Sequence, residues 1–444
     1  MIHGPLLGKI LIFTIPLMAS SILQLLFNAA DIVVVGRFAG SEALAAVGST
    51  GALINLLTNV FMGLSVGANV LVARYYGAGQ QEEASETVHT SILLSIVAGL
   101  FLAVVGIVFA APLLRLMGTP EDVLPLAALY IQIYFAGMPV VLIYNYGSAI
   151  LRAIGDTKRP LYYLAVAGAL NVVLNLIFVI PLQMSVAGVA LATILSQALS
   201  AVLVLRCLMR AEGGCHLDLH RLRIYKTKLK KILQLGLPAG FQGSIFSLSN
   251  VLIQSSVNSF GSIAMAGNSA AANIEGFTYV AMNSFHQAAI TFVSQNMGAM
   301  EFKRIRKVAI QCLICVVITG ATIGNLSYLF GNTLLGIYSS DPQVIQYGMV
   351  RLSIIGTTYF LCGIMDVGVG CLRGINYSVL PMIVSLLGAC GMRIIWIFTI
   401  FRRMHDQTIL YISYPISWFI TSAVHIICFV LLFRRMVKRY EMRE

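Results

Sequence analysis

An acidic residue inside a membrane-length apolar segment limits what this chain can fold into. The segment from Ile10 to Val35 is long enough to cross a bilayer, since a spanning helix needs about 20 apolar residues, yet it contains Asp31. A carboxylate at that depth costs about 2.5 to 3.5 kcal/mol on insertion scales, so it normally faces a bundle interior or a water-filled cavity. Asp31 is either a structural acid paired with Arg37 or with a neighbouring helix, or a cation-binding group on a transport path. We favour the second interpretation.

The composition is that of a protein that crosses the membrane many times. Of the 444 residues, 58% are hydrophobic and only 10% are charged, whereas soluble proteins carry about 25% charged residues. The net charge of +12 does not indicate a nucleic-acid partner, because the Lys and Arg residues lie in short loops between apolar runs, where they set orientation. Most of them fall on the side that holds the two termini, which predicts that both termini are cytoplasmic.

Apolar runs and the residues that interrupt them predict an all-α polytopic membrane protein with twelve transmembrane helices. The expected spans are 10–35, 43–73, 88–110, 123–150, 160–181, 186–206, 231–260, 262–297, 308–330, 343–372, 380–401 and 409–433.

The two halves of the chain repeat one another. Leu151–Ile154 matches Leu372–Ile375, and Pro160 matches Pro381 at the same shift. A repeat of six spans gives both copies the same orientation, as in carriers that rock around a central site. We therefore expect two pseudo-symmetric lobes, at 1–206 and 231–444, joined by a basic cytoplasmic linker at 207–230. The linker's basic run is interpreted as a topology determinant, with binding of anionic membrane lipid as the alternative.

Four polar residues of the first half are expected at a similar depth. Asn171 and Asn175 lie one helical turn apart, and Thr193 lies on the next span at the level of Asp31. A carboxylate, two amides and a hydroxyl suit a hard monovalent cation such as Na⁺, or a protonated carboxyl group. The alternative is that the Asn and Thr side chains only join neighbouring transmembrane helices.

The second half offers weaker candidates for substrate binding or coupling. Glu275 and Asp366 are its only acids within predicted spans, and either one is a group for a cationic substrate or a partner of Arg351 or Arg393. A lone His in such a span is more often a packed polar contact than a proton carrier. The full set of candidates, with one from the first half, is Asn28, Glu275, Asp366, His286, Gln287 and Arg393.

The chain contains no motif of an enzyme or of an ATP-driven pump. A Walker lysine loop, a zinc-binding H-E-x-x-H, a dinucleotide fingerprint and a nucleophile elbow are all absent. We therefore expect no catalytic residues and no cofactor, and uphill movement has to draw on an ion gradient or on a partner.

Several short motifs resemble those of the multidrug and toxic compound extrusion family, in a bacterial branch. The resemblance covers both halves and lies in Pro16–Met18, Asn28–Asp31, Val35–Arg37, Ala73–Gly79, Leu151–Asp156 and Leu372–Gly374.

The resemblance implies export of amphipathic, often cationic drugs by Na⁺ or H⁺ antiport, with alternating access. It also implies a cation site at the positions of Asp31, Asn171, Asn175 and Thr193, in which Asn175 stands where some members have a second Asp. It implies a multi-pass protein of the bacterial inner (plasma) membrane, which we expect to act as a monomer. A flippase for lipid-linked sugars is the alternative, disfavoured because the spans offer few cations besides Arg351 and Arg393.

Overall fold

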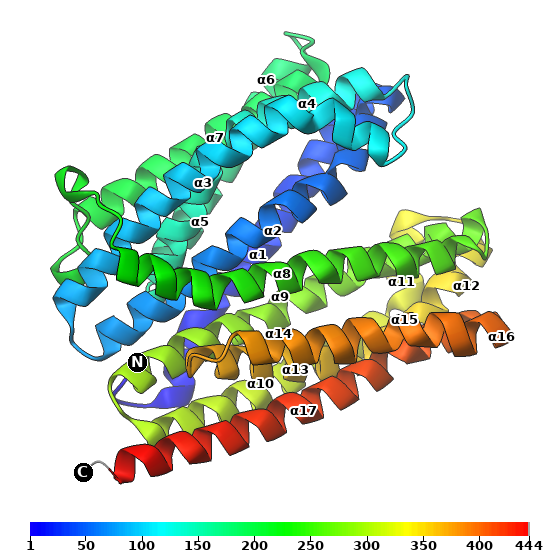
Figure 1. Ribbon diagram of the computed structural model, residues 1–444. Helices are drawn as coiled ribbons and strands as arrows, with labels where there is room; N and C mark the ends of the chain where they lie inside the picture. The colour runs from blue at the N-terminus through cyan, green and yellow to red at the C-terminus, as the bar shows by residue number, and fades with distance from the viewer. Residues whose placement is uncertain (443–444) are drawn as a thin grey trace. The chain divides into compact units, whose positions relative to one another are not determined.

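The computed structural model describes residues 1–442 and is almost entirely helical (Figure 1). Its α-helices are α1 (Leu6–Phe38), α2 (Ser41–Gly77), α3 (Gln81–Leu116), α4 (Leu124–Ala136), α5 (Met138–Ala153), α6 (Lys158–Val179), α7 (Ser185–Met209), α8 (Lys226–Asn258), α9 (Ser262–Gly298), α10 (Phe302–Leu329), α11 (Gly331–Tyr338), α12 (Pro342–Arg351), α13 (Phe360–Gly374), α14 (Val379–Ser385), α15 (Met392–Trp396), α16 (Arg402–Met404) and α17 (Gln407–Glu441).

Each of the twelve predicted spans coincides with helical structure. Eight helices are long and apolar enough to cross a membrane, and two bent helix pairs raise that number to ten. The remaining two spans are α8 and α9, which are equally long but carry more polar residues. The sequence predicted an unbroken helix over 123–150, whereas α4 and α5 meet at 50°. The bend lies at Gly137, just before Pro139, which lacks the N–H that a continuous helix needs.

The chain divides into two compact units whose boundaries lie inside helices. One unit comprises residues 19–244, and the other comprises residues 1–18 with 245–444. The first turns of α1 therefore pack in one unit and the rest of α1 in the other, and α8 is divided in the same way. The sequence repeat, in contrast, suggests a boundary in the linker. The repeat reflects a duplication of the sequence, whereas the two units are defined by contacts in the structure. The units therefore do not test the predicted lobes 1–206 and 231–444, which stay a prediction.

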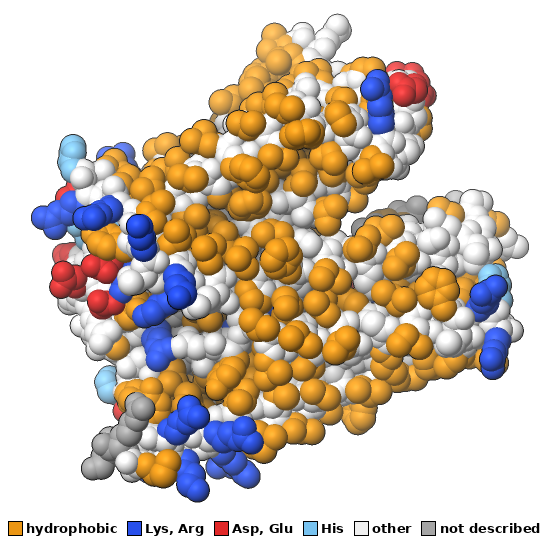
Figure 2. Space-filling model, viewed as in Figure 1, with side chains coloured by type: hydrophobic (Ala, Val, Ile, Leu, Met, Phe, Trp, Pro, Cys, Tyr) orange, Lys and Arg blue, Asp and Glu red, His pale blue; other side chains and the backbone are white. Residues whose placement is uncertain are grey.

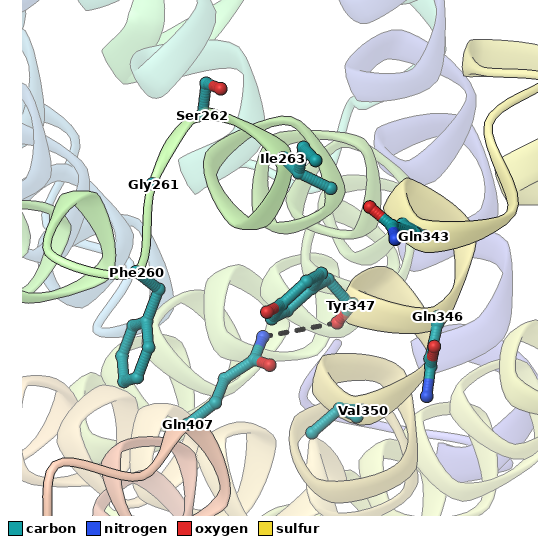
Figure 3. A pocket seen from close by; sticks show the side chains of 9 residues that line it. All are labelled: Phe260, Gly261, Ser262, Ile263, Gln343, Gln346, Tyr347, Val350 and Gln407. Atoms are coloured by element: carbon teal, nitrogen blue, oxygen red, sulfur yellow. Dashed lines mark hydrogen bonds between the residues drawn. The ribbon is translucent and has the colours of Figure 1, made fainter.

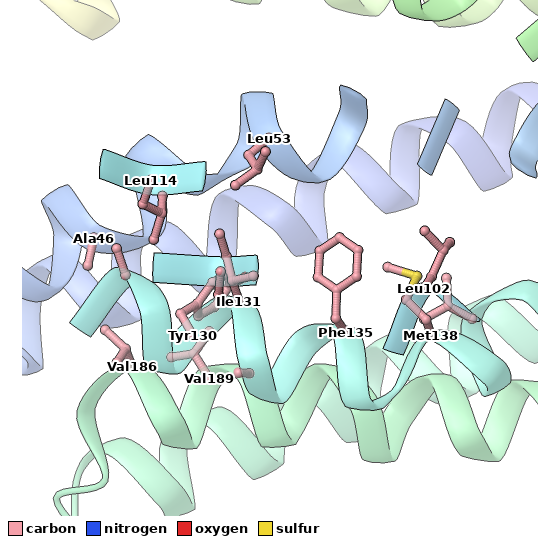
Figure 4. Close-up of a cluster of buried hydrophobic side chains, with 14 of the residues drawn as sticks. Ala46, Leu53, Leu102, Leu114, Tyr130, Ile131, Phe135, Met138, Val186 and Val189 are labelled. Atoms are coloured by element: carbon pink, nitrogen blue, oxygen red, sulfur yellow. The ribbon is translucent and has the colours of Figure 1, made fainter. Parts of the chain in front are cut away.

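The core of the 19–244 unit is built from large apolar side chains of α2 to α5. Phe135, Met138 and Tyr146 are fully buried, and Figure 4 shows Phe135 and Met138 close to Leu102 of α3. Burying a side chain of this size contributes about 1.5 to 3 kcal/mol in water, although in lipid close packing replaces much of that term.

The other unit has a core of its own that includes the start of the chain. Phe13 of α1 packs edge-on against Phe292 of α9, with ring centroids 5.5 Å apart. The guanidinium of Arg304 donates hydrogen bonds to the carbonyl oxygens of Met1 and Gly4. The amino-terminal segment is thus held by both apolar and polar contacts to residues far along the sequence.

The exposed surface of each unit has the pattern of a membrane protein. Hydrophobic side chains cover the middle of the helices over wide areas, and the Lys and Arg side chains gather near helix ends (Figure 2). In α3, for example, Leu100, Phe101 and Val104 are each more than half exposed. Such areas are stable only in contact with lipid.

Glycines let α2 and α8 approach closely within the 19–244 unit. A Cβ atom added to Gly63 would lie 2.2 Å from the backbone nitrogen of Gly240, and one added to Gly67 would lie 2.5 Å from the carbonyl oxygen of Ile232. These obstacles are backbone atoms and cannot rotate away. Small residues allow this kind of backbone contact between transmembrane helices.

A buried lysine fixes the start of α8 to the same unit. Lys228 is 4% exposed and donates a hydrogen bond to the carboxylate of Glu83, and its Nζ lies 3.5 Å from the carboxylate of Glu86. It also lies 4.5 Å from the ring centroid of Tyr75, whose hydroxyl accepts a hydrogen bond of 2.9 Å from Lys231. Part of the basic run is therefore used inside the protein and is not free for lipid headgroups.

We expect Gly240→Ala to destabilise the purified protein, because overpacking against a fixed backbone costs about 1 to 3 kcal/mol. The control is Gly243→Ala, one turn further along α8, where an added Cβ meets only the Asn59 side chain at 3.5 Å. Both substitutions bring the same gain in helix preference. The measurement is the thermal unfolding midpoint in detergent. A midpoint that falls for Gly240→Ala but not for Gly243→Ala confirms the close contact of α2 and α8, and equal midpoints contradict it.

The Glu83–Lys228 pair should weaken in acid. The hydrogen bond that Glu83 accepts from Lys228 holds the pKa of Glu83 below its ordinary value of 4.5. The pair therefore stabilises the folded protein above pH 4.5, and this stabilisation is lost as the pH falls through the lowered pKa. We expect Glu83→Gln to lower the unfolding midpoint at pH 7, and the gap to the wild type to close below pH 4.5. Glu82→Gln, at an exposed neighbouring acid, serves as the control. A gap that does not change with pH would argue against the pair.

Candidate functional site

An aromatic side chain over a glycine brings α1 next to α6. Phe27 of α1 lies where a side chain of Gly168 would be, since a Cβ added there would come within 1.8 Å of the Phe27 ring. Asp31 follows Phe27 by one helical turn, and Asn171 and Asn175 follow Gly168 by one and two turns. The contact between Phe27 and Gly168 is thus consistent with the position of Asp31 beside the two asparagines.

Asp31 is part of a connected group of polar side chains from three helices. Asn175 donates a hydrogen bond to the Asp31 carboxylate and another of 3.0 Å to Oδ1 of Asn171. Asn171 in turn lies 3.4 Å from Oγ1 of Thr193 and 3.5 Å from Oγ of Ser196, both on α7. The structure therefore brings together all four residues that the sequence singled out for a cation site.

The group combines one carboxylate with several oxygens in a buried setting. Asn171 and Asn175 are 5% and 1% exposed, whereas Asp31 is partly accessible. Oδ1 of Asn175 is buried without a hydrogen-bond partner among the described residues. A buried acceptor without a donor costs about 1 to 3 kcal/mol. The site thus combines an amide oxygen that accepts no hydrogen bond from the described residues with a carboxylate. Together these oxygens are suitable ligands for a small cation.

Of the structural interpretation of Asp31, the ion pair with Arg37 is not seen, whereas its other form, a hydrogen bond to a neighbouring helix, is present between Asn175 of α6 and Asp31. Among residues 1–442, no salt bridge involves Asp31. Asn28, one turn before Asp31, is exposed and lies outside the hydrogen-bonded group. Tyr130 of α4, a 9%-exposed phenol, lies within electrostatic reach of Asp31.

Sequence reasoning missed Ser196 and Tyr130. Ser196 lies three residues after Thr193, so the helical spacing alone places both hydroxyls on one face of α7. Tyr130 carries no such signal, because its position next to Asp31 depends on how α4 packs.

In the second unit, Glu275 forms a buried ion pair with Arg351. Their closest atoms are 2.7 Å apart, with two further hydrogen bonds of 3.1 Å from Nε of Arg351. Nη1 of Arg351 donates to Oδ1 of Asn268 at 2.7 Å. Of the two roles open to Glu275, pairing with an arginine is therefore the one with a visible contact.

A polar chain leads from this ion pair to a surface pocket. Asn268 accepts a hydrogen bond of 2.9 Å from the hydroxyl of Tyr411, which accepts one of 3.1 Å from Gln407. Gln407 also donates to the carbonyl oxygen of Tyr347 at 3.3 Å (Figure 3). It lines a pocket of 540 Å³. The other lining residues are Phe260, Gly261, Ser262, Ile263, Gln343, Gln346, Tyr347 and Val350.

The remaining candidates of the second unit lie apart from this ion pair. Nδ1 of His286 lies 2.5 Å from the carbonyl oxygen of Asp366, and its ring is 7% exposed, which fits a packed polar contact. The Asp366 carboxylate is in electrostatic contact with Arg373 and forms no salt bridge among residues 1–442. Gln287 is partly buried on α9. The suggested partnership of Asp366 with Arg351 or Arg393 is not present.

Arg393 of α15 is buried and stacked on aromatic rings. Its guanidinium lies 4.2 Å from the ring centroid of Tyr414 and 5.3 Å from that of Trp418, and its Nε donates to Ser417 at 2.8 Å. All three partners lie on one face of α17.

Comparison with known proteins agrees with this architecture. The sequence model of the MatE family matches twice, at residues 16–177 and 238–399, which also confirms the internal repeat. A probable multidrug resistance protein of Bacillus subtilis, YoeA, is 28% identical, with 86% of this chain and 84% of that protein covered. A FAD transporter of Shewanella oneidensis is 25% identical, with 86% of each chain covered.

A solved structure described as the outward-facing conformation of a multidrug resistance MATE family transporter has a TM-score of 0.91. It is 22% identical to this chain, and 98% of each chain is covered. At this identity the likeness speaks for the fold alone. It confirms the predicted all-α membrane fold of twelve transmembrane helices, and the relatives are transporters and not enzymes.

Removing one partner of the Glu275–Arg351 pair should destabilise the protein strongly. Glu275→Gln leaves a buried, unpaired arginine, which costs about 3 to 5 kcal/mol, whereas the double variant Glu275→Gln/Arg351→Met removes both charges and should recover much of that loss. The measurement is the unfolding midpoint of the purified protein for the wild type, both single variants and the double variant. Additive losses in the double variant would mean that the two side chains do not depend on each other.

Proposed function

This chain belongs to the MatE family of multidrug transporters, and from that premise we propose that it is a cation-coupled exporter of amphipathic drugs. Na⁺ or H⁺ would enter down its gradient and drive the outward movement of cargo by alternating access. No ATP-binding motif offers another energy source within this chain.

The observation that carries the proposal is the polar group around Asp31. It holds one carboxylate, amide and hydroxyl oxygens, and the unpartnered Oδ1 of Asn175. Na⁺ prefers oxygen ligands, and the same carboxylate is a single-proton acceptor, so the site is chemically suited to either ion. Its one formal negative charge supports the exchange of one monovalent cation in each cycle.

The position of Asp31 on α1 supports a link between binding and conformational change. α1 begins in the unit of residues 1–18 and 245–444 and continues, with Asp31, into the unit of residues 19–244. A cation shifts the equilibrium between two conformations of the protein only if it binds one of them more tightly than the other. Because Asp31 is hydrogen-bonded to α6, occupancy of the site changes the restraints on the helix that the two units share.

We place the protein in the bacterial plasma membrane as a monomer with both termini in the cytoplasm. The relatives are bacterial, and the chain has the apolar helices of a multi-pass protein. The excess of Lys and Arg in the loops on the side of the termini supports the orientation.

The proposed cargo is amphipathic and often cationic, following the multidrug names of the relatives. One relative, however, is named as a FAD transporter, so an anionic flavin nucleotide is a second candidate cargo. A flippase for lipid-linked sugars is less well supported, because a pyrophosphate calls for several cations and Glu275 already neutralises Arg351.

The carboxylate of Asp31 should be required for coupled efflux. We expect Asp31→Asn to abolish drug efflux from proteoliposomes under both an imposed Na⁺ gradient and an imposed pH gradient, because an amide neither titrates nor carries the charge that a cation needs. Fluorescence of a preloaded cationic dye reports the efflux, and the wild type under each gradient identifies the coupling ion.

The control for this experiment is Glu121→Gln, which removes an exposed acid of the same unit whose side chain is 78% accessible. It should retain efflux at the wild-type rate. Wild-type efflux from a correctly folded Asp31→Asn protein would refute the role of Asp31, and loss in both variants would point to a general effect of charge.

A further inference from the structure

One buried positive charge of the second unit has no counter-charge. Arg393 is 3% exposed, and none of the salt bridges in residues 1–442 involves it. Its Nη2 is buried without a hydrogen-bond partner. Arg351, in the same unit, shows the usual solution, with a carboxylate at 2.7 Å and an amide oxygen at 2.7 Å. A buried charge without such a partner is costly to the protein.

The contacts that Arg393 does make leave its charge uncompensated. Ser417 accepts one hydrogen bond, and the rings of Tyr414 and Trp418 stack against the guanidinium. A cation–π contact stabilises the guanidinium, but it supplies no hydrogen-bond acceptor for Nη2. The guanidinium is therefore held rigidly on two rings with a donor group still available, which is the arrangement that favours recognition of a carboxylate or phosphate.

A row of aromatic rings leads from this arginine to an accessible surface. Trp418 lies 5.3 Å from Tyr359, and Tyr359 is stacked on Tyr279 with centroids 6.4 Å apart. Tyr279 is 39% exposed. The row connects the buried guanidinium of Arg393 to the exposed ring of Tyr279, which gives a planar aromatic molecule an apolar surface to pack against.

We propose that Arg393, with Tyr414, Ser417 and Trp418, forms an anion subsite for planar aromatic cargo that carries a carboxylate or phosphate. The inference rests on the proposed function as an exporter and deepens it, because it names the residues that would bind an organic anion, the class to which the candidate flavin nucleotide belongs. The acidic group would accept hydrogen bonds from the free guanidinium nitrogen, and the ring system would stack along Tyr359 and Tyr279.

The test compares two dyes that share a flat xanthene ring system but differ in charge. Fluorescein is an anion at pH 7.5 and rhodamine 123 is a cation. Fluorescence anisotropy with the purified full-length protein in detergent gives the Kd of each dye. Binding at equilibrium requires no ion gradient, so loss of coupling in Asp31→Asn, or failure of the exporter proposal, leaves this measurement unaffected.

We expect the wild type to bind fluorescein and Arg393→Met to bind it about 10- to 100-fold more weakly, since hydrogen bonds to charged groups contribute on that order. The affinity for rhodamine 123 should stay unchanged or increase. The control is Arg402→Met, which removes a positive charge from an exposed position a few turns further along the same helical segment. It should leave both affinities unchanged.

Three results would overturn the proposal. These are absence of fluorescein binding by the wild type, a fluorescein affinity within two-fold of the wild type in folded Arg393→Met, and equal weakening of both dyes. Should Arg393→Met fail to fold, Arg393→Lys keeps the charge but loses the planar fork. It is then expected to weaken fluorescein about 10-fold with rhodamine 123 unaffected, and an unchanged fluorescein affinity refutes the subsite.

Discussion

Buried charge in an apolar helix bundle governs the chemistry of both units. Water is absent from the bilayer core, so every ionised side chain there depends on polar groups from neighbouring helices. Asp31 has the amide of Asn175, and Glu275 has the guanidinium of Arg351. In the first case the partner is a neutral amide, so no positive charge of the protein neutralises the carboxylate in this contact. In the second case the charges cancel, and the pair is suited to holding helices together.

Much of the Asp31 site was accessible to sequence reasoning because it depends on periodicity. Asn171 and Asn175 share a face of one helix, and the depth of Thr193 follows from the distance to the end of its span. The contact of Phe27 with Gly168 was not predictable in this way, because it depends on the rotation of two helices about their axes. The same applies to Tyr130. Spacing along a helix predicts which residues share a face but not which helix that face meets.

The second unit shows the limit of sequence reasoning more clearly. Two acids and two arginines permit several pairings, and hydropathy alone cannot choose among them. The structure pairs Glu275 with Arg351. Asp366 lies near Arg373, and Arg393 is stacked on aromatic rings. The bend between α4 and α5 has a similar origin, since Gly137 and Pro139 indicate a weak point, but the angle of 50° is set by packing. The sequence therefore predicted the positions of the twelve spans, but not their bends, and the charge partners only in part.

The division of α1 between two units has a consequence for biosynthesis. Met1–Met18 packs with residues beyond Ile245, so this segment leaves the ribosome long before its partners are made. Residues 19–244 can assemble while the opening turns of the chain still wait in the translocon or in lipid. Contacts of such long sequence separation slow folding. The amino-terminal turns thus reach their final neighbours only after most of the chain has been made.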